Sequence, residues 1–222
     1  MAENRPQAAD GGGPRPARQF VVPPPQHNFE EAAKRALEAV RKQPAEQLEW
    51  LGARGAGQHW TIRVLDGDLS VDLDAGTVRT NGAAAVAAAW RILALHYLAA
   101  PGRPVQGLPE VSFADLPGGR TYARVYRQRV IERLCATVGR ESSGLSKACQ
   151  ALGGSAVAVG DLGFDFQVFP RIGVRLVWYA GDDELHPDAT VLYPGNIGSV
   201  MEIEDVVVMA ERLVSRLCGR PW

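Results

Sequence analysis

The chain of 222 residues is long enough for one domain of ordinary size, with or without a tail, and its hydrophobic fraction of 46% allows a sizeable core. The 24 basic and 25 acidic residues leave a net charge of −1, which gives no electrostatic reason to expect nucleic acid or an anionic membrane as a partner. The three cysteines, Cys135, Cys149 and Cys218, form no C-x-x-C pair. This excludes the usual cysteine motifs for zinc and for an iron–sulfur cluster, and it favours reduced structural thiols in a cytoplasmic protein.

The first 26 residues are rich in glycine and proline and have little apolar surface to offset the entropy lost on ordering. We therefore expect residues 1–26 to be a disordered tail. Their polar character does not fit a signal peptide. A role of the tail as a docking arm for an aromatic groove stays open as the alternative.

Residues 27–82 are expected to form a helical and β-meander extension in front of the main domain. Asn28 can cap a helix over 29–42, and Pro44 stops that helix or starts a second one over 45–51. A glycine-rich loop over 52–57 is expected next. Three short strand-like runs, separated by turn signals, predict an antiparallel meander over residues 60–65, 69–73 and 77–80.

The longest apolar run, residues 83–100, is rich in alanine and contains Arg91 and His96. It falls short of the roughly 20 strongly apolar residues that a membrane span needs. The run predicts a helix that Asn81 caps, and because it is apolar nearly all round, the helix should lie at the centre of residues 83–222. We expect His96 to be a core histidine with one ring nitrogen satisfied, and a ligand role is the alternative.

The rest of the chain alternates blocks of helix and blocks of strand. The patterns predict helices over 120–138, 145–152 and 202–217, and strands over 156–159, 164–169, 174–179 and 190–193. Short strand connections favour antiparallel pairing over a doubly wound parallel sheet. We therefore predict an α+β fold, with antiparallel sheets packed against a central Ala-rich helix and several amphipathic helices.

The acidic segment 178–205 contains the candidate metal site. Oxygen ligands and one imidazole suit a divalent cation, and the same carboxylates could serve as acid and base. The candidate ligands are Asp182, Asp183, Glu184 and His186 in the first part, and Glu204 and Asp205 in the second. The alternative is that the first acids occupy a solvated turn, while Glu202, Glu204 and Asp205 favour a helix N-terminus through its dipole. The spacing matches no standard metal motif.

A second candidate site begins at Gly118, Gly119 and Arg120, where paired glycines open a helix. Backbone N–H groups there could approach an anion or carboxylate, and Arg120 could clamp it. Tyr122 and Trp178 complete this predicted ligand-binding set. A tight structural turn is the alternative, and the missing lysine and hydroxyl exclude a P-loop. No nucleophile elbow and no dinucleotide fingerprint is present.

Four short motifs carry a resemblance to a known family. In chain order they are Val111-Ser112-Phe113 through Leu116-Pro117-Gly118-Gly119 to Tyr122; Leu152-Gly153-Gly154; Phe169-Pro170-Arg171-Ile172 with Val177-Trp178 and Gly181-Asp182-Asp183-Glu184-Leu185; and Glu204-Asp205. On these motifs, over residues 83–217, the chain resembles the uncharacterised bacterial and archaeal family known as domain of unknown function 3786. The resemblance leaves the meander outside the family.

The resemblance implies no particular activity. Some relatives resemble fusions to iron–sulfur domains; this chain has no such cysteine cluster, so any cluster would have to lie on a separate redox or metalloprotein partner. After Thr190-Val191-Leu192 the chain has Tyr193-Pro194 where the family tends to show a Phe-Asp pair, so a site that used that aspartate would be lost.

We favour a soluble binding or accessory protein that recognises a small anionic ligand or a redox protein partner. The alternatives are a metal-dependent enzyme that uses Asp182, Asp183, Glu184 and His186, and an assembly subunit tethered by its tail. The sequence leaves open whether the protein is an enzyme, and it does not predict an oligomeric state.

Overall fold

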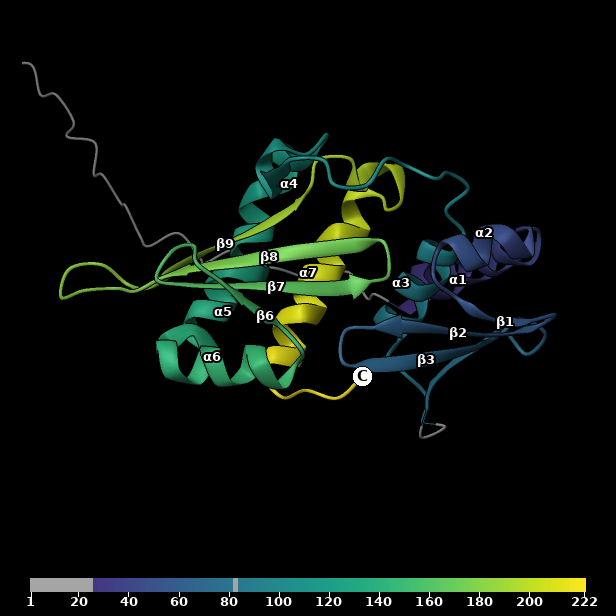
Figure 1. The fold of residues 1–222 in the computed structure, drawn as a ribbon, viewed down its shortest axis with the longest axis horizontal. Helices are drawn as coiled ribbons and strands as arrows, with labels where there is room; N and C mark the ends of the chain where they lie inside the picture. Colours follow the sequence, from purple (N-terminus) through teal and green to yellow (C-terminus); the bar gives the residue numbers. More distant parts are fainter. Residues whose placement is uncertain (1–25, 82–83) are drawn as a thin grey trace, which may run out of the picture.

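The computed structural model describes residues 26–81 and 84–222, with side chains described from residue 30 (Figure 1). Residues 1–25 of the predicted tail lie outside this range. Within the described residues, nine strands form two antiparallel sheets, and helices pack around both of them. The predicted α+β class with antiparallel sheets is therefore confirmed.

The first sheet is the predicted meander with one additional strand. Its strands run in the order β1-β2-β3-β4, and all neighbours are antiparallel. They are β1 (Arg54–Ala56), β2 (His59–Val64), β3 (Gly67–Asp72) and β4 (Thr77–Thr80). The glycine-rich stretch predicted as a loop is strand over 54–56, because Gly57 turns the chain with a φ of 58° and lets Ala56 pair with His59.

Helices α1 (Gln26–Arg41) and α2 (Ala45–Trp50) precede this sheet. Pro44 stands at the N-cap of α2 and so starts the second helix, one of the two outcomes predicted for it. Ala33, Leu37 and Val40 form the buried stripe of α1, as their spacing predicts.

Helix α3 (Ala88–Leu98) is the predicted apolar helix, but it is shorter than the run of apolar residues. Ala85 forms a bridge with Arg79, and the Thr80 backbone N–H donates to the Ala84 carbonyl oxygen at 2.9 Å. These residues therefore extend the edge of β4, and Ala87, not the predicted Asn81, is the N-cap. Most of α3 is buried, as its apolar character predicts.

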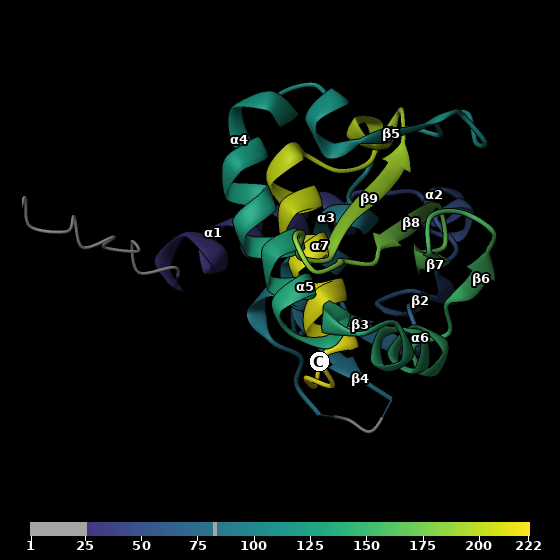
Figure 2. The same ribbon diagram turned by 90° about the vertical axis from the view of Figure 1, so that its left-hand side faces the viewer.

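The second sheet has the strand order β5-β9-β8-β7-β6, again with antiparallel neighbours. Its strands are β5 (Glu110–Ser112), β6 (Ser155–Val157), β7 (Leu162–Phe169), β8 (Ile172–Tyr179) and β9 (Asp188–Pro194). In Figure 1 helix α7 (Ile203–Leu217) passes behind this sheet, and Figure 2 shows α7 between the sheet and α4 (Gly119–Tyr126).

The long amphipathic helix predicted over 120–138 is broken into three parts. Helix α4 leads into a π-helical segment, η2 (Arg127–Glu132), which leads into α5 (Arg133–Ala136). Such a segment shifts the side-chain register within one helical rod. Helix α6 (Ser142–Ala151) follows, and Gly153 takes the predicted left-handed position after it with a φ of 79°.

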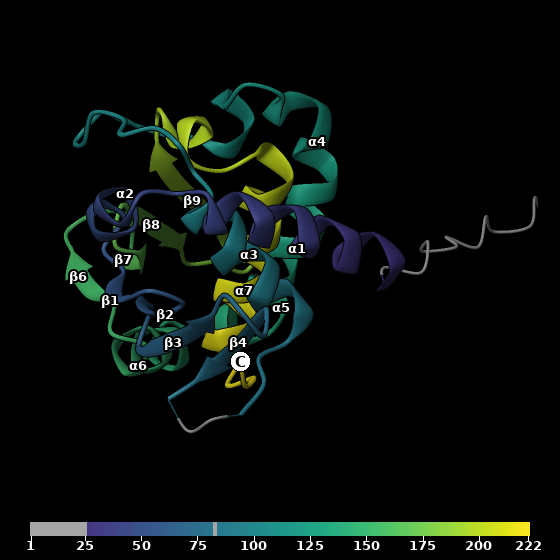
Figure 3. The ribbon, with the colours of Figure 1, turned by 90° about the vertical axis from the view of Figure 1, so that its right-hand side faces the viewer.

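The two sheets share one buried core. The Leu65 backbone N–H donates to the Val168 carbonyl oxygen at 3.2 Å, which joins the turn between β2 and β3 to β7. At the C-terminus the Trp222 ring lies 5.0 Å from the Trp90 ring, centroid to centroid. Helix α3 lies between α1 and α7, as Figure 3 shows from the side of α1. Among the described residues, no helix has both the length and the apolar character that a membrane crossing requires.

Candidate functional site

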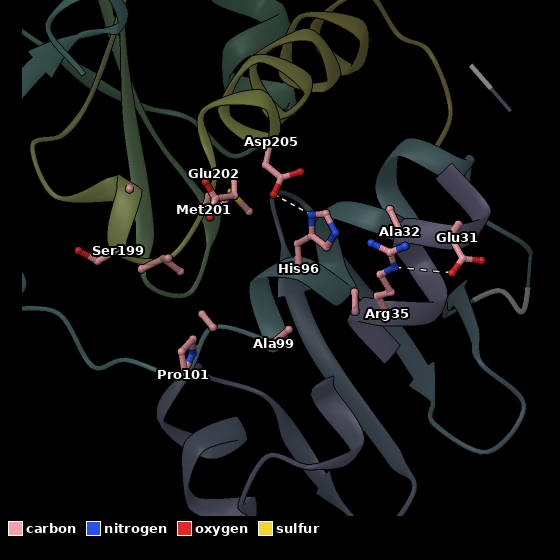
Figure 4. A pocket seen from close by; sticks show the side chains of 14 residues that line it. Glu31, Ala32, Arg35, His96, Ala99, Pro101, Ser199, Met201, Glu202 and Asp205 are labelled. Carbon is pink, nitrogen blue, oxygen red and sulfur yellow. Dashed lines mark hydrogen bonds and ion pairs between the residues drawn. The ribbon is translucent and has the colours of Figure 1, made fainter. Parts of the chain in front are cut away.

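His96 and Asp205 form the polar centre of the candidate site. His96 lies near the end of α3, and Asp205 lies in the first turn of α7, where a carboxylate is favoured by the helix dipole. The His96 Nδ1 and Asp205 Oδ2 atoms are 2.7 Å apart (Figure 4). The side chains are 29% and 10% exposed, so water screens this pair only partly.

The carboxylate favours the protonated imidazole. The hydrogen bond to Asp205 is the largest influence and raises the pKa of His96, while burial opposes it and the charges of Asp205 and Glu202 support it. Because Nδ1 is occupied by Asp205, Nε2 is the nitrogen that remains for another group. The sequence prediction of one satisfied ring nitrogen on His96 is confirmed, but the residue is half-buried at the edge of a cavity and is not part of the core.

A cavity of about 610 Å³ opens at this pair, and we call it the His96 cavity. Three parts of the chain line it, and their lining residues are Glu31, Ala32, Arg35 and Ala36 of α1; His96, Ala99, Ala100 and Pro101 at and after the end of α3; and residues 198–202 together with Asp205. In Figure 4 Glu202 and Met201 lie on one side of His96, and Arg35 and Glu31 lie on the other. The Ser199 side chain points away from His96 in the same view, so the cavity does not contain a Ser-His-Asp arrangement.

The charged side chains of the His96 cavity differ in how they are compensated. Arg35 Nε lies 3.6 Å from Glu31 Oε1, and His96 is paired with Asp205. Glu202 is the N-cap residue of α7, but its side chain makes no capping hydrogen bond. Within the part of the chain that the structure describes, the Glu202 carboxylate has no basic partner within ion-pair distance.

The predicted metal ligands do not come together. Asp182 Oδ1 accepts the backbone N–H groups of Glu184 and Leu185, both at 2.8 Å, and these bonds lower the pKa of Asp182. The exposed Asp183 and Glu184 complete a solvated turn at one end of the second sheet, and α7 begins on the other side (Figure 1).

The other predicted ligands have separate surroundings. Glu204 Oε1 accepts the Tyr122 hydroxyl at 3.1 Å, Asp205 faces His96, and His186 lines a different cavity. Among residues 26–81 and 84–222, no group of three or more His, Cys, Asp or Glu side chains is arranged to hold a metal ion. The loop and the helix start come from opposite ends of the sheet, which sequence spacing does not reveal.

The predicted ligand-binding residues are also divided. Trp178 is buried, and its Nε1 donates to the Gly139 carbonyl oxygen at 2.8 Å. It is therefore part of the hydrophobic core. A Cβ at Gly119 would lie 1.9 Å from the Phe113 carbonyl oxygen, and the Gly119 N–H donates to Leu116 at 2.8 Å. The paired glycines are therefore accounted for by a tight turn.

Gly118, Arg120 and Tyr122 remain exposed beside that turn. The turn adjoins a smaller cavity of about 320 Å³ that Leu116 and Pro117 line from one side. This cavity shares Glu202 and three neighbouring residues with the His96 cavity. An anion site at Gly118 and Arg120 stays a prediction.

His186 contributes to a separate cavity of about 640 Å³, which Cys135 also lines and which we call the Cys135 cavity. Burial is the main cause that raises the pKa of the Cys135 thiol, to about 11. The thiol is thus protonated near neutral pH, which is the opposite of an activated nucleophile.

Comparison with known families shows which family the chain belongs to. The family model described as Domain of unknown function (DUF3786) matches residues 43–216, so the chain belongs to this family. The match includes α2 and the meander, which the short motifs alone had left outside it. No curated protein and no solved structure matches the chain significantly.

The pairing of His96 with Asp205 is the feature that sequence reasoning missed. A histidine within an almost wholly apolar helix was a usable signal, since a buried imidazole needs a hydrogen-bond partner. Asp205 had already been marked as a candidate ligand. The partner itself could not be chosen, because five acids lie within the two predicted groups.

Proposed function

We propose that this member of the DUF3786 family binds a small molecule in the His96 cavity, with an oxygen of the ligand accepting a hydrogen bond from His96 Nε2. The observation that carries the proposal is the His96–Asp205 pair at a cavity of about 610 Å³. A cavity with a few convergent polar groups and a titratable residue with a shifted pKa is typical of binding sites.

The pair supports this role because Asp205 holds the imidazole in one orientation. A carboxylate that accepts from Nδ1–H fixes both the ring and its tautomer, so that Nε2 faces the cavity as an acceptor in the neutral ring and as a donor in the protonated ring. Asp205 raises the pKa of His96 and so favours the protonated ring, in which Nε2 donates a charge-assisted hydrogen bond. Such hydrogen bonds are about twice as strong as neutral ones. A carboxylate, amide or phosphate oxygen would suit this donor.

The charge balance argues against the purely anionic ligand that the sequence predicted. Three carboxylates and two basic side chains line the cavity, so its charge is negative even with His96 protonated. The ligand therefore needs an oxygen acceptor but not an overall negative charge.

The test is a nuclear magnetic resonance titration of the histidine ring nitrogens. We would add acetate, 4-methylpentanoate, acetamide and inorganic phosphate separately, and assign the His96 signals with His96→Gln. At least one probe should move the His96 Nε2 signal in a saturable way, and His96→Gln should abolish that binding. His59→Gln, at an exposed histidine outside the cavity, should bind as the wild type does.

Absence of a saturable shift with every probe would contradict the proposal, as would unchanged binding by His96→Gln. Circular dichroism of the variant separates loss of the donor from loss of the fold. Recognition of a redox or metalloprotein partner and a tail-mediated assembly role stay predictions. The metal-dependent alternative now lacks a ligand group among the described residues.

A further inference from the structure

The Cys135 cavity is a second cavity of the size that small molecules occupy. Its volume is about 640 Å³, within the range of about 300–1,000 Å³ that is typical of ligand sites, and it shares no lining residue with the His96 cavity. One wall is the helical rod that runs from η2 through α5 to η3 (Val138–Arg140). The opposite wall is the segment from His186 to Asp188, where β9 begins. The proposed function makes no use of this cavity.

Both walls of the Cys135 cavity offer apolar surface. Ile131, Cys135 and Ala136 supply it from the helical rod, and Pro187 supplies it from the opposite wall. Ile131 belongs to the buried hydrophobic core, so this part of the lining is held in place by packing. Burial raises the pKa of the Cys135 thiol and keeps it protonated, so it is a neutral, polarisable group that suits an apolar neighbour.

The charged side chains of the Cys135 cavity set no requirement for an ionic ligand. Arg127 already has two acidic partners, because its Nη2 lies 3.2 Å from Asp188 Oδ1 and its Nε lies 3.8 Å from Glu132 Oε1. The Arg127–Asp188 pair also joins the two walls to each other. Arg140 and His186 are exposed, so water compensates them. What the cavity offers a ligand beyond water is therefore its apolar surface.

The π-helical segment η2 is an independent indication of a site at this wall. It contributes Arg127, Ile131 and Glu132 to the lining. Such segments are rare, and they frequently lie at functional sites, because they change the side-chain register within a helix. Here the change of register comes directly before α5, which supplies Cys135 and Ala136 to the cavity.

We propose that the Cys135 cavity is a second binding site and that its ligand is a small uncharged apolar molecule, of the aromatic or cyclic aliphatic class. The driving force is the transfer of apolar surface out of water. A polar molecule of the same size would lose its hydration without gaining matching hydrogen bonds from Ile131, Ala136 and Pro187. The site is independent of the His96 cavity and adds to the proposed function.

Protection of Cys135 from alkylation reports directly on this cavity. We would add cyclohexanol, indole and benzyl alcohol separately, alkylate with iodoacetamide at mildly alkaline pH, and follow each cysteine by mass spectrometry. At least one probe should slow the alkylation of Cys135 by about tenfold in a saturable way, because a bound molecule blocks access to the thiol. The half-buried Cys218 lies outside the cavity and should react at an unchanged rate. myo-Inositol, which has the ring of cyclohexanol with a hydroxyl on every carbon, should not protect Cys135.

Two matched variants locate the binding. Ala136→Leu places a larger side chain in the lining and should weaken the protecting probe by about tenfold, because it fills space that the probe needs. Ala151→Leu is the control, since Ala151 is an exposed alanine at the end of α6 outside the cavity, and it should bind as the wild type does. His96→Gln should also leave the protection of Cys135 unchanged, because the two cavities have separate linings.

The inference is wrong if no apolar probe protects Cys135, or if myo-inositol protects it as well as cyclohexanol does. Equal binding by Ala136→Leu and the wild type would overturn it too. None of these results affects the proposal for His96, which a different probe signal tests. If Ala136→Leu alters the fold by circular dichroism, Ala136→Met is the second variant, because methionine also adds volume and favours a helix, and it should weaken binding in the same direction.

Discussion

Replacing Asp205 by Asn tests the electrostatic reasoning about the His96–Asp205 pair. The amide oxygen of Asn can still accept the His96 Nδ1–H bond, so the change removes the charge and keeps the shape. Asp205 lies in the first turn of a helix whose inner face is buried, and its side chain is only 10% exposed. The variant should fold, with a lower free energy of unfolding.

The expected magnitude follows from the kind of hydrogen bond that is lost. A hydrogen bond to a charged group contributes about 1.5–3 kcal/mol, and a neutral one contributes about 0.5–1.5 kcal/mol. The difference is about 1–1.5 kcal/mol, which corresponds to a Tm lower by about 2–6 °C for a chain of this size. Asp183→Asn, in the exposed turn, should change stability by less than about 0.5 kcal/mol.

The effect should depend on pH in a defined direction. Asp205 raises the pKa of His96 above its ordinary value of 6.5, so the folded state binds the proton more tightly than the unfolded state. The resulting stabilisation is fully present below about pH 6.5 and is lost as pH rises through the folded-state pKa of His96. The gap between wild type and Asp205→Asn should therefore be wider at about pH 6 than at about pH 9.

Urea unfolding at several pH values measures this gap, and a histidine ring titration gives the pKa directly. A gap that is the same at both pH values would refute the reasoning. So would a His96 pKa at or below 6.5 in the wild type, or a pKa that Asp205→Asn leaves unchanged.

Three further predictions concern other parts of the molecule. Gly119→Ala should destabilise the fold by several kcal/mol, because its Cβ would collide with the Phe113 carbonyl oxygen at 1.9 Å. Gly118→Ala, at a φ of 80° and with its Cβ in ordinary contact with Ile203 at 3.7 Å, should cost only about 1 kcal/mol, and thermal unfolding compares the two variants. Tyr126→Phe and Tyr193→Phe should each lower the free energy of unfolding by about 1–3 kcal/mol, because each leaves the hydroxyl of the other tyrosine buried without its partner. The double variant should lose less than the sum of the two single losses, as urea unfolding would show. Iodoacetamide should modify Cys135 about tenfold more slowly than an unperturbed thiol at neutral pH, because a pKa of about 11 in place of 9.0 lowers the thiolate population and the greater nucleophilicity of that thiolate offsets only part of the loss. Equal rates by mass spectrometry would contradict this.

The elements that the sequence predicted well are those with a strong local pattern. The meander follows from its turn signals, and the apolar stripe of α1 follows from helical spacing. The predictions that failed concern boundaries set by distant contacts. Residues 84–85 have helix-forming alanines, yet their backbone groups pair with β4, because an available strand edge outweighs a weak intrinsic preference.

The candidate site divides in the same way. The sequence by itself determined that an acidic carboxylate would begin α7 and that a lone histidine would lie in an apolar helix that must be buried. Only the tertiary structure decided that His96 and Asp205, 109 residues apart, would meet at 2.7 Å. The physical reason is that helix packing fixes which side chains face each other, and local patterns specify only which face of each helix is buried. The same packing separated the acids of the 182–184 turn from those of α7, so a cluster in the sequence became two unrelated surfaces.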